Sequence, residues 1–408
     1  MIADEYVFDE HPKPQEIEDF LESHPQSNLL QHARWSQVKE NWSMKQVVVR
    51  RGGTIRAYAM ILIRPLPLGL SLFYIPRGPI ANYQDEPLIR FLFAKLKKLA
   101  RRSHAVTLRF DPNLIDRAYP YAQRNQNHDE HHQAAVVQLL TGLKCRHKGY
   151  TLYLREATQP RFQAVMLREQ MDWAALNAKT RRSIRHAEKC GVTIHEGETE
   201  LDPFVEVMKQ TEQRKKIHLR NAEYFKRLMT LYGERAVLMT ARLDLNQRRN
   251  QIEDQISELE RKPEELNKVE KEQIINLNRE QEFLEKKLSQ GLSVVTLCGL
   301  LALIQDDQME VLYAGTNSEF LTYRAPYSVH WKLFEKARKM GIQRCNLGGV
   351  EGTLDDGLFI FKSSFSPKID VYIGEFSLPC KPVLYPIWTQ LLPKVKELRR
   401  QWIRRESH

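Results

Sequence analysis

The sequence predicts an α/β (α+β) protein built from two units of similar order, with a helical hairpin inserted in the second. In the first third of the chain, amphipathic helices alternate with short apolar strands, which is the order of an α/β unit. A similar alternation returns after residue 158. Residues 244–290 interrupt it with a charged segment that is nearly free of glycine and aromatic residues.

The size and charge of the chain indicate two domains and an anionic partner. The chain has 408 residues, which is long enough for two domains with sizeable cores. Its formal net charge is +11. Such a balance favours RNA, phosphorylated metabolites or an acidic membrane surface as partners.

The cysteines and the N-terminal residues predict a cytoplasmic protein. The five cysteines are widely spaced and form no CxxC pair, which is typical of reduced thiols and not of disulfides or a zinc site. Residues 1–14 are acidic and polar, so we expect no signal peptide. The longest apolar run, Val294–Ile304, is too short to span a bilayer, and peripheral contact with an anionic membrane surface stays open.

The first unit opens with a predicted helix over residues 15–42, on which Gln31, Trp35 and Lys39 share one face. A hairpin turn is expected at Gly52-Gly53. The other expected elements are strands at Val47–Arg51, Arg56–Ile63, Ser71–Ile75 and Ala105–Phe110, and a helix at Pro87–Ser103.

A polar segment at residues 120–133 separates the two units. Its histidines, His128, His131 and His132, have neither the spacing of metal ligands nor a second ligand group, so we expect a solvated loop and no metal. Two strands are expected beyond it, at Thr151–Arg155 and Gln163–Leu167.

The second unit begins with a predicted helix that has a basic face. This helix spans Trp173–Lys189, and its cationic residues are Lys179, Arg181, Arg182, Arg185 and Lys189. The other expected elements are helices at Pro203–Lys216, Ala222–Tyr232 and Ala325–Met340, and strands at Ala236–Leu243, Ser293–Gln305, Met309–Gly315 and Arg344–Leu347.

The inserted segment predicts two antiparallel helices that form a short coiled-coil arm. Apolar side chains step by seven, four and three residues from Leu245, and the pattern resumes after Pro263. Contact of this arm with RNA stays open, because mixed charge usually forms a solvated face. A last helix is expected at Ile387–Arg405, and its basic side indicates either a docked helix or a surface for RNA or anionic lipid.

A glycine-containing stretch, Asn346–Phe365, follows the last expected strand. We expect that strand to break at Gly348-Gly349, before an acidic turn and the pair Phe361-Lys362. Adjacent glycines let backbone N–H groups approach a ligand closely and the lysine adds a charge, so the stretch can receive an anion. On its own, such a pattern is more often an ordinary loop.

Several stretches together resemble the FemABX family, the peptidoglycan-bridge aminoacyltransferases, and its MurM and FemA branch most. They follow one another along nearly the whole chain, which is far more specific than any one of them. The stretches are Gln31, RWSQVKENW, FYIPRGPI, TLRFDP, TQPR, IHLRNAEYF, LYAGT, YRAPY, NLGG, LFIFKSSF and YIGE.

This resemblance implies two tandem acyltransferase-like domains of the GNAT type. Domain 1 would comprise residues 1–157 and 376–408, with the C-terminal helix returning to it, and domain 2 residues 158–375 with the arm at 244–290. The implied activity transfers an aminoacyl group, alanine or serine in MurM-like members, from aminoacyl-tRNA to the stem-peptide lysine of lipid II. Lipid II is a lipid-linked peptidoglycan precursor, and no cofactor is expected.

The resemblance assigns an acceptor site to four residues. Lys39 matches a lysine that binds the phosphates of the precursor, and Arg220 with Tyr224 matches a phosphate-binding pair. Tyr313 matches another tyrosine of the acceptor site, whereas His218 replaces a hydroxyl residue, so its role is open. On a helix, Arg220 and Tyr224 would share one face. Without the family, Lys39 is a solvated charge and Arg220 a surface ion pair.

The resemblance also implies a donor site and candidate proton acceptors. Phe361 and Lys362 match the pair that packs against the 3′ adenosine of the tRNA. Asp111 and Glu375 match carboxylates considered as proton acceptors. The alternatives are core packing for Phe361, and for Asp111 a strand-end turn before a proline.

The implied chemistry is direct transfer without a covalent intermediate. The donor is an ester, and the acceptor amine, whose ordinary pKa is about 10.4, must lose a proton before it attacks. No Cys-His or Ser-His-Asp pattern is evident, so positioning is expected to supply most of the rate. We hypothesise that Asp111 or Glu375 accepts the proton, or that a ribose hydroxyl shuttles it. Lys362 would hold the tRNA terminus or stabilise the oxyanion.

Two other functions are compatible with parts of the sequence. A coenzyme-A-dependent N-acetyltransferase would share the domain type, but it needs a glycine-rich pyrophosphate loop that leads into a helix, and no RxxGxG/A string occurs. A non-catalytic scaffold would use the basic body and the arm to bind RNA or a membrane.

Overall fold

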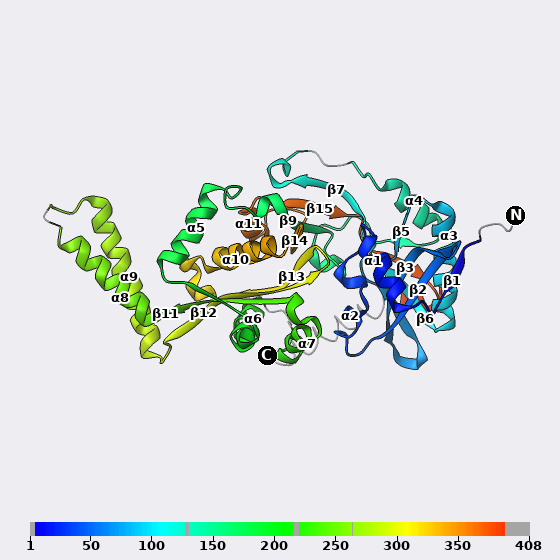
Figure 1. Ribbon diagram of the computed structural model, residues 1–408, viewed down its shortest axis with the longest axis horizontal. Coiled ribbons are helices and arrows are strands. Elements are labelled where there is room, and N and C mark those ends of the chain that lie inside the picture. Colours follow the sequence, from blue (N-terminus) through cyan, green and yellow to red (C-terminus); the bar gives the residue numbers. More distant parts are fainter. Residues whose placement is uncertain (1–4, 127–129, 216–219, 263, 388–408) are drawn as a thin grey trace. The chain divides into compact units, whose positions relative to one another are not determined.

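The computed structural model describes residues 5–126, 130–215, 220–262 and 264–387, which form two compact units (Figure 1). The first unit contains the described residues of the segments 1–165, 347–363 and 367–408. The second contains those of 166–346 and 364–366. The chain forms two mixed β-sheets with helices packed on them, which confirms the predicted α/β class.

The first unit is built on an eight-stranded sheet with the order β1-β2-β3-β4-β6-β16-β8, in which β5 pairs with β3. Strands β2 (Ser43–Arg51) and β3 (Thr54–Pro65) form the predicted hairpin, and β4 (Ser71–Ile75) runs antiparallel to β3. Helix α3 (Glu86–Arg102) then crosses over to β6 (Ala105–Phe110), which pairs with β4 in parallel.

The core of this unit lies between α3 and the sheet. Helix α3 begins after Asp85, whose carboxylate accepts a hydrogen bond from the Leu88 N–H, and its apolar side chains recur every three or four residues. The ring of Phe93 lies 4.9 Å from that of Phe110, which stacks on Phe376 at 5.3 Å. This packing holds the end of β6.

A second eight-stranded sheet has the order β10-β11-β12-β13-β14-β9-β15-β7. Its strands β11 (Ala236–Asp244), β12 (Val294–Gln305) and β13 (Gln308–Thr316) are antiparallel. Helix α10 (Ala325–Lys339) then crosses over to β14 (Arg344–Val350), which pairs with β13 in parallel.

Helices cover both faces of the strands in the second unit (Figure 1). Helices α5 (Ala178–Lys189) and α10 lie on one face, and α6 (Leu201–Lys215) and α7 (Ala222–Tyr232) lie on the other. Close packing of α6 requires glycine at position 299, because a Cβ there would lie 2.9 Å from the Phe204 ring.

The remaining helices and strands are mostly short. Their bounds are β1 (Val7–Asp9), α1 (Pro14–Ser23), α2 (Ala33–Ser36), β5 (Ile80–Ala81), β7 (Ile115–Pro120), α4 (Ala134–Gly142), β8 (Arg146–His147), β9 (Phe162–Leu167), β10 (Thr193–Glu196), α11 (Gly357–Ser363), β15 (Lys368–Tyr372), β16 (Phe376–Pro379) and α12 (Leu384–Pro386).

The same order of elements occurs twice. In β2-β3-β4-α3-β6 and in β11-β12-β13-α10-β14, an antiparallel run is followed by a helical crossover into a parallel strand. The repetition confirms the prediction of two units of similar order. It also gives each repeat one parallel pair, β4 with β6 and β13 with β14.

The inserted arm consists of two packed helices, as predicted (Figure 1). They are α8 (Leu245–Glu260), which directly follows β11, and α9 (Lys268–Ser289), which precedes β12. The guanidinium of Arg248, in the first turns of α8, donates hydrogen bonds of 2.7 and 3.0 Å to the Glu280 carboxylate in the second half of α9. The helices are therefore antiparallel.

The predicted helix over residues 15–42 is wrong. Helix α1 ends at Ser23, because His24 precedes Pro25 and is extended, with φ −96° and ψ 126°. The Gln31 side chain is buried and accepts a hydrogen bond of 3.0 Å from the Met60 N–H. It thus packs into the body instead of sharing a helix face with Lys39, which follows α2.

Two further local predictions are wrong. The expected strand at Thr151–Arg155 is replaced by a 3-10 turn at Leu154–Glu156. Strand β14 does not break at Gly348-Gly349 but continues to Val350. The glycines allow this course: Gly348 has φ +86°, and a Cβ on Gly349 would lie 2.5 Å from Pro160.

The predicted domain boundaries at residues 157 and 375 stay a prediction, since a compact unit is not the same thing as a fold repeat. The predicted helix Ile387–Arg405 lies outside the described residues, apart from its first. Among the described helices, none combines the length and the apolar character needed to cross a membrane.

The close contact at Gly349 predicts a stability difference between two glycines. We expect Gly349→Ala to lower the free energy of unfolding by about 1–3 kcal/mol, because the new methyl group overlaps Pro160. Gly357→Ala is the control, since a Cβ there meets nothing within 4 Å, and it should change stability by less than about 0.5 kcal/mol. Urea unfolding measures both, and equal effects would contradict the packing argument.

Candidate functional site

Asp111 follows the end of β6 and is almost completely buried, with 2% of its surface exposed. The Tyr74 hydroxyl donates a hydrogen bond of 2.8 Å to one carboxylate oxygen, and the Arg77 backbone N–H donates one of 2.6 Å to the other. Tyr74 is on β4 and Arg77 follows it, so Asp111 ties together the ends of the parallel pair β4 and β6. Ligand sites in α/β sheets commonly lie at the carboxyl ends of such strands.

Burial raises the pKa of Asp111 to about 7, because removal from water disfavours the charged carboxylate. The positive charge of Arg77 and the two hydrogen bonds lower this pKa, and the charge of nearby Glu375 raises it. Near neutral pH this carboxyl group can therefore hold or release a proton.

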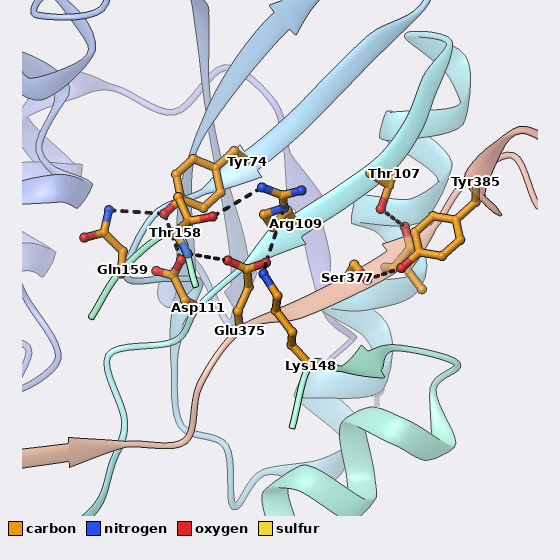
Figure 2. Close-up of polar contacts among 11 residues, drawn as sticks. Tyr74, Thr107, Arg109, Asp111, Lys148, Thr158, Gln159, Glu375, Ser377 and Tyr385 are labelled. Carbon is orange, nitrogen blue, oxygen red and sulfur yellow. Dashed lines mark hydrogen bonds and ion pairs between the residues drawn. The ribbon is translucent and has the colours of Figure 1, made fainter. Parts of the chain in front are cut away.

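Glu375 is the second buried carboxylate, and it is paired with two cations (Figure 2). The Thr158 backbone N–H donates a hydrogen bond of 2.8 Å to it. The Lys148 ammonium lies 3.4 Å and the Arg109 guanidinium 3.5 Å from a Glu375 oxygen. Glu375 thus accepts a backbone hydrogen bond and lies within ion-pair distance of two cations.

Residues Thr158–Arg161, the TQPR stretch, connect the two carboxylates. Besides the Thr158 contact with Glu375, the Gln159 amide donates a hydrogen bond of 3.2 Å to the Tyr74 hydroxyl. The Pro160 carbonyl accepts one of 2.7 Å from the Arg77 guanidinium. This short segment thus contacts Glu375 directly and holds both hydrogen-bond partners of Asp111.

Lys362 belongs to the same network. It lies on the seven-residue helix α11 and is only 6% exposed. Its ammonium donates a hydrogen bond of 2.8 Å to the Gly349 carbonyl, and Gly349 lies against Pro160. The neighbouring Phe361 is half-buried, whereas Phe359 is buried with its ring 5.7 Å from that of Tyr121.

In the second unit, three residues predicted for the acceptor site come together. The Tyr313 hydroxyl on β13 donates a hydrogen bond of 3.1 Å to the Tyr224 hydroxyl on α7, and the Arg220 guanidinium lies 4.9 Å from the centre of the Tyr224 ring. Arg220 is not in the helix, contrary to the prediction, because Asn221 caps α7 by accepting the Tyr224 N–H. Burial raises the pKa of Tyr224, so its hydroxyl stays protonated.

Lys39 belongs to the first unit and follows helix α2. Its ammonium lies 5.0 Å from the centre of the Trp35 ring, which is a cation–π distance. His218 lies outside the described residues.

His131 lies in a loop, as predicted, but its side chain is only partly solvated. Its Nδ1 lies 2.6 Å from a carboxylate oxygen of buried Asp116, and its ring stacks on Tyr150 with centroids 3.7 Å apart. His128 lies outside the described residues, and across the residues that are described no three His, Cys, Asp or Glu side chains are grouped to hold a metal ion.

Sequence reasoning missed the residues that support the two carboxylates. Tyr74 and Arg77 stood in FYIPRGPI and Arg109 in TLRFDP, but a single sequence does not show that these stretches meet. No feature of the sequence indicated that Lys148 belongs to the site. Only the pairing of β16 with β6 and β8 brings Lys148 and Arg109 to Glu375.

The chain is similar to known proteins along most of its length. The model of the FemAB family matches residues 13–392. Curated relatives from Staphylococcus aureus strains RF122 and MSSA476 are named lipid II:glycine glycyltransferase; each is 26% identical over 425 residues, covering 95% of this chain and 97% of the relative.

Two solved structures show the same fold. FemX has 24% identity and a TM-score of 0.70, covering 94% of this chain and 99% of its own. A tandem GNAT protein from the clavulanic acid pathway has 10% identity and a TM-score of 0.51, covering 93% of this chain and 99% of its own. The implied fold of two tandem GNAT-like domains is thereby confirmed.

The raised pKa of Asp111 predicts a pH-dependent stability. The folded protein binds this proton more tightly than the unfolded chain, whose Asp pKa is about 3.9, so stability from this group is present below pH 4 and is lost as pH rises to about 7. We expect the unfolding free energy of the wild type relative to Asp111→Asn to fall by about 1–4 kcal/mol between pH 4 and pH 7. Urea unfolding across this range measures it, and a difference that is flat with pH would contradict the assignment.

Proposed function

The chain belongs to the FemAB family, and from this premise we propose that it is an aminoacyltransferase that builds the interpeptide bridge of peptidoglycan. It would transfer an amino acid from aminoacyl-tRNA to the stem-peptide lysine of lipid II. The name of the relatives supports lipid II as the acceptor and glycine as a transferred residue. The resemblance to MurM-like members favours alanyl- or seryl-tRNA, so the donor is to be decided among these three.

The observation that carries this proposal is the cluster of Arg220, Tyr224 and Tyr313. Tyr224 and Tyr313 are 89 residues apart, yet their hydroxyls are hydrogen-bonded, and Arg220 lies over the Tyr224 ring. An exposed guanidinium next to two hydroxyls provides several donors for a diphosphate. Lys39, with its ammonium over Trp35, would add a further charge for the same precursor.

On the donor side, Phe361 and Lys362 would receive the tRNA terminus. A half-buried ring suits stacking on the terminal adenine. The buried ammonium of Lys362, hydrogen-bonded to Gly349, has a fixed position from which it can hold the terminus or stabilise the oxyanion.

Asp111 and Glu375 remain the candidate proton acceptors. Asp111 has a pKa near 7, which suits a general base at neutral pH, but both of its oxygens already accept hydrogen bonds. Glu375 is held by Lys148, Arg109 and the Thr158 N–H. If neither accepts the proton, the ribose hydroxyl next to the ester does.

One assay tests the activity. The protein is incubated with lipid II and a mixture of glycyl-, alanyl- and seryl-tRNA, and the lipid product is weighed by mass spectrometry. We expect lipid II to gain the mass of one of these residues. No gain with any charged tRNA would refute the proposal, and thiol release from acetyl-CoA with an amine would instead support an acetyltransferase.

The same assay tests one residue of the acceptor site and the two carboxylates. Arg220→Gln should raise KM for lipid II about tenfold or more, because a hydrogen bond to a charged group contributes about 1.5–3 kcal/mol. Arg214→Gln, an exposed arginine on α6, is the control for charge and should not change it. Wild-type rates in both Asp111→Asn and Glu375→Gln would leave the ribose hydroxyl as the proton shuttle.

We further propose that the connection between β3 and β4 touches the membrane that carries lipid II. Leu68 at its tip is 96% exposed and held at φ +61° between Pro67 and Gly69. At the base of the loop, the Arg64 guanidinium lies 5.9 Å from the centre of the Trp42 ring. An apolar tip above a Trp–Arg pair is typical of proteins that dip into a bilayer interface.

Leu68→Asp tests this contact by sedimentation with vesicles of phosphatidylglycerol and phosphatidylcholine. We expect binding to weaken about tenfold, since the leucine contributes roughly 1.5 kcal/mol on leaving water. Leu321→Asp, which changes an exposed leucine of the second unit in the same way, should have no effect. Equal binding of both variants would refute the role of the loop while leaving the transferase activity untouched.

A further inference from the structure

Helix α5 presents a row of cations that the acceptor and donor sites do not use. Lys179, Arg182, Arg185 and Lys189 are all exposed, and the helix contains one carboxylate, Glu188. They recur every three or four residues, so they lie along one side of the helix. At 1.5 Å per residue, the row spans roughly 15 Å.

These cations differ from those of the neighbouring helix α10, which packs against α5. On α10, Lys332 pairs with Glu335, Lys336 with Glu196, and Arg338 with Asp172. The four cations of this row make no ion pair with any described residue. A solvated helix usually mixes its charges, so an unneutralised row indicates an anionic partner.

The row is held rigidly. The buried side of α5 carries Thr180, Ser183, Ile184 and Ala187. The Arg185 guanidinium lies 5.4 Å from the centre of the Trp173 ring, and that ring packs edge-on against Trp331 at 5.1 Å. A guanidinium that is already ordered loses less entropy when it binds a phosphate.

The start of the helix is anchored beside the donor segment in the chain. The Asn177 amide and the Thr180 hydroxyl both donate hydrogen bonds to the Ser364 carbonyl, at 2.6 and 2.5 Å. Ser364 comes two residues after Lys362. The first turn of α5 is therefore bound to Ser364, which follows the donor pair Phe361-Lys362 closely in the sequence.

We propose that α5 binds the phosphate backbone of the acceptor arm of the donor tRNA. The inference rests on the proposed function and names a surface for its RNA substrate. Regularly spaced Lys and Arg on a rigid helix suit backbone phosphates, which carry no sequence information. A membrane is the less suitable partner, because no large apolar side chain of α5 is exposed.

A fourfold variant tests this surface: Lys179→Gln, Arg182→Gln, Arg185→Gln and Lys189→Gln. We expect KM for aminoacyl-tRNA to rise at least tenfold, with KM for lipid II and kcat at saturating tRNA unchanged. The dependence of log Kd for a tRNA acceptor minihelix on log salt should lose a slope of about 3, because each of the four phosphate contacts contributes roughly 0.7–0.9.

The matched control removes four exposed cations from the first unit, by Lys13→Gln, Arg56→Gln, Lys98→Gln and Lys144→Gln. It should keep the wild-type tRNA affinity and salt slope. Equal effects of the two variants would reduce the result to net charge and overturn the proposal. So would unchanged tRNA binding with lost binding to anionic vesicles, which would make α5 a membrane surface.

These outcomes are separate from those of the proposed function. If the wild-type protein transfers amino acids but the fourfold variant binds tRNA as tightly as the wild type, only the role of α5 is overturned. A wild-type protein that transfers nothing from any charged tRNA overturns the proposed function, and with it this inference. Circular dichroism and thermal melting of the variant identify a loss of folding.

Discussion

The structure of the first unit depends on the short segment Thr158–Arg161. The Thr158 N–H donates a hydrogen bond to Glu375, and the Gln159 amide donates one to Tyr74. The Pro160 carbonyl accepts one from Arg77. Strand β14 also passes so close to Pro160 that only glycine fits at position 349. The segment therefore fixes two buried carboxylates and the carbonyl that Lys362 binds.

The electrostatics of the two buried carboxylates differ for a clear reason. Burial raises the pKa of Asp111 to about 7, although its two hydrogen bonds and the charge of Arg77 act in the opposite direction. Glu375 instead forms ion pairs with Lys148 and Arg109. Burial is costly for a charge unless it is paired, and the two cations provide such pairing for Glu375.

The repeated crossover explains where the candidate residues lie. In the first repeat, Asp111 follows the parallel pair β4 and β6, and in the second, Tyr313 lies on β13 and the glycines lie near the end of β14. A parallel pair must be joined by a helix, which leaves its carboxyl ends open to loops with polar residues. The same backbone plan thus places different polar side chains at corresponding positions of its two copies.

The sequence by itself determined the α/β class, the two units, the helical arm and the family, because periodicity, turn residues and ordered motifs are local signals. It also singled out Arg220, Tyr224 and Tyr313, through the resemblance alone. Only the tertiary structure decided that Gln31 lies outside any long helix and accepts a hydrogen bond from Met60, and that β14 continues through its glycines. Both outcomes depend on contacts between residues far apart in the chain, and local propensity carries no information about such contacts.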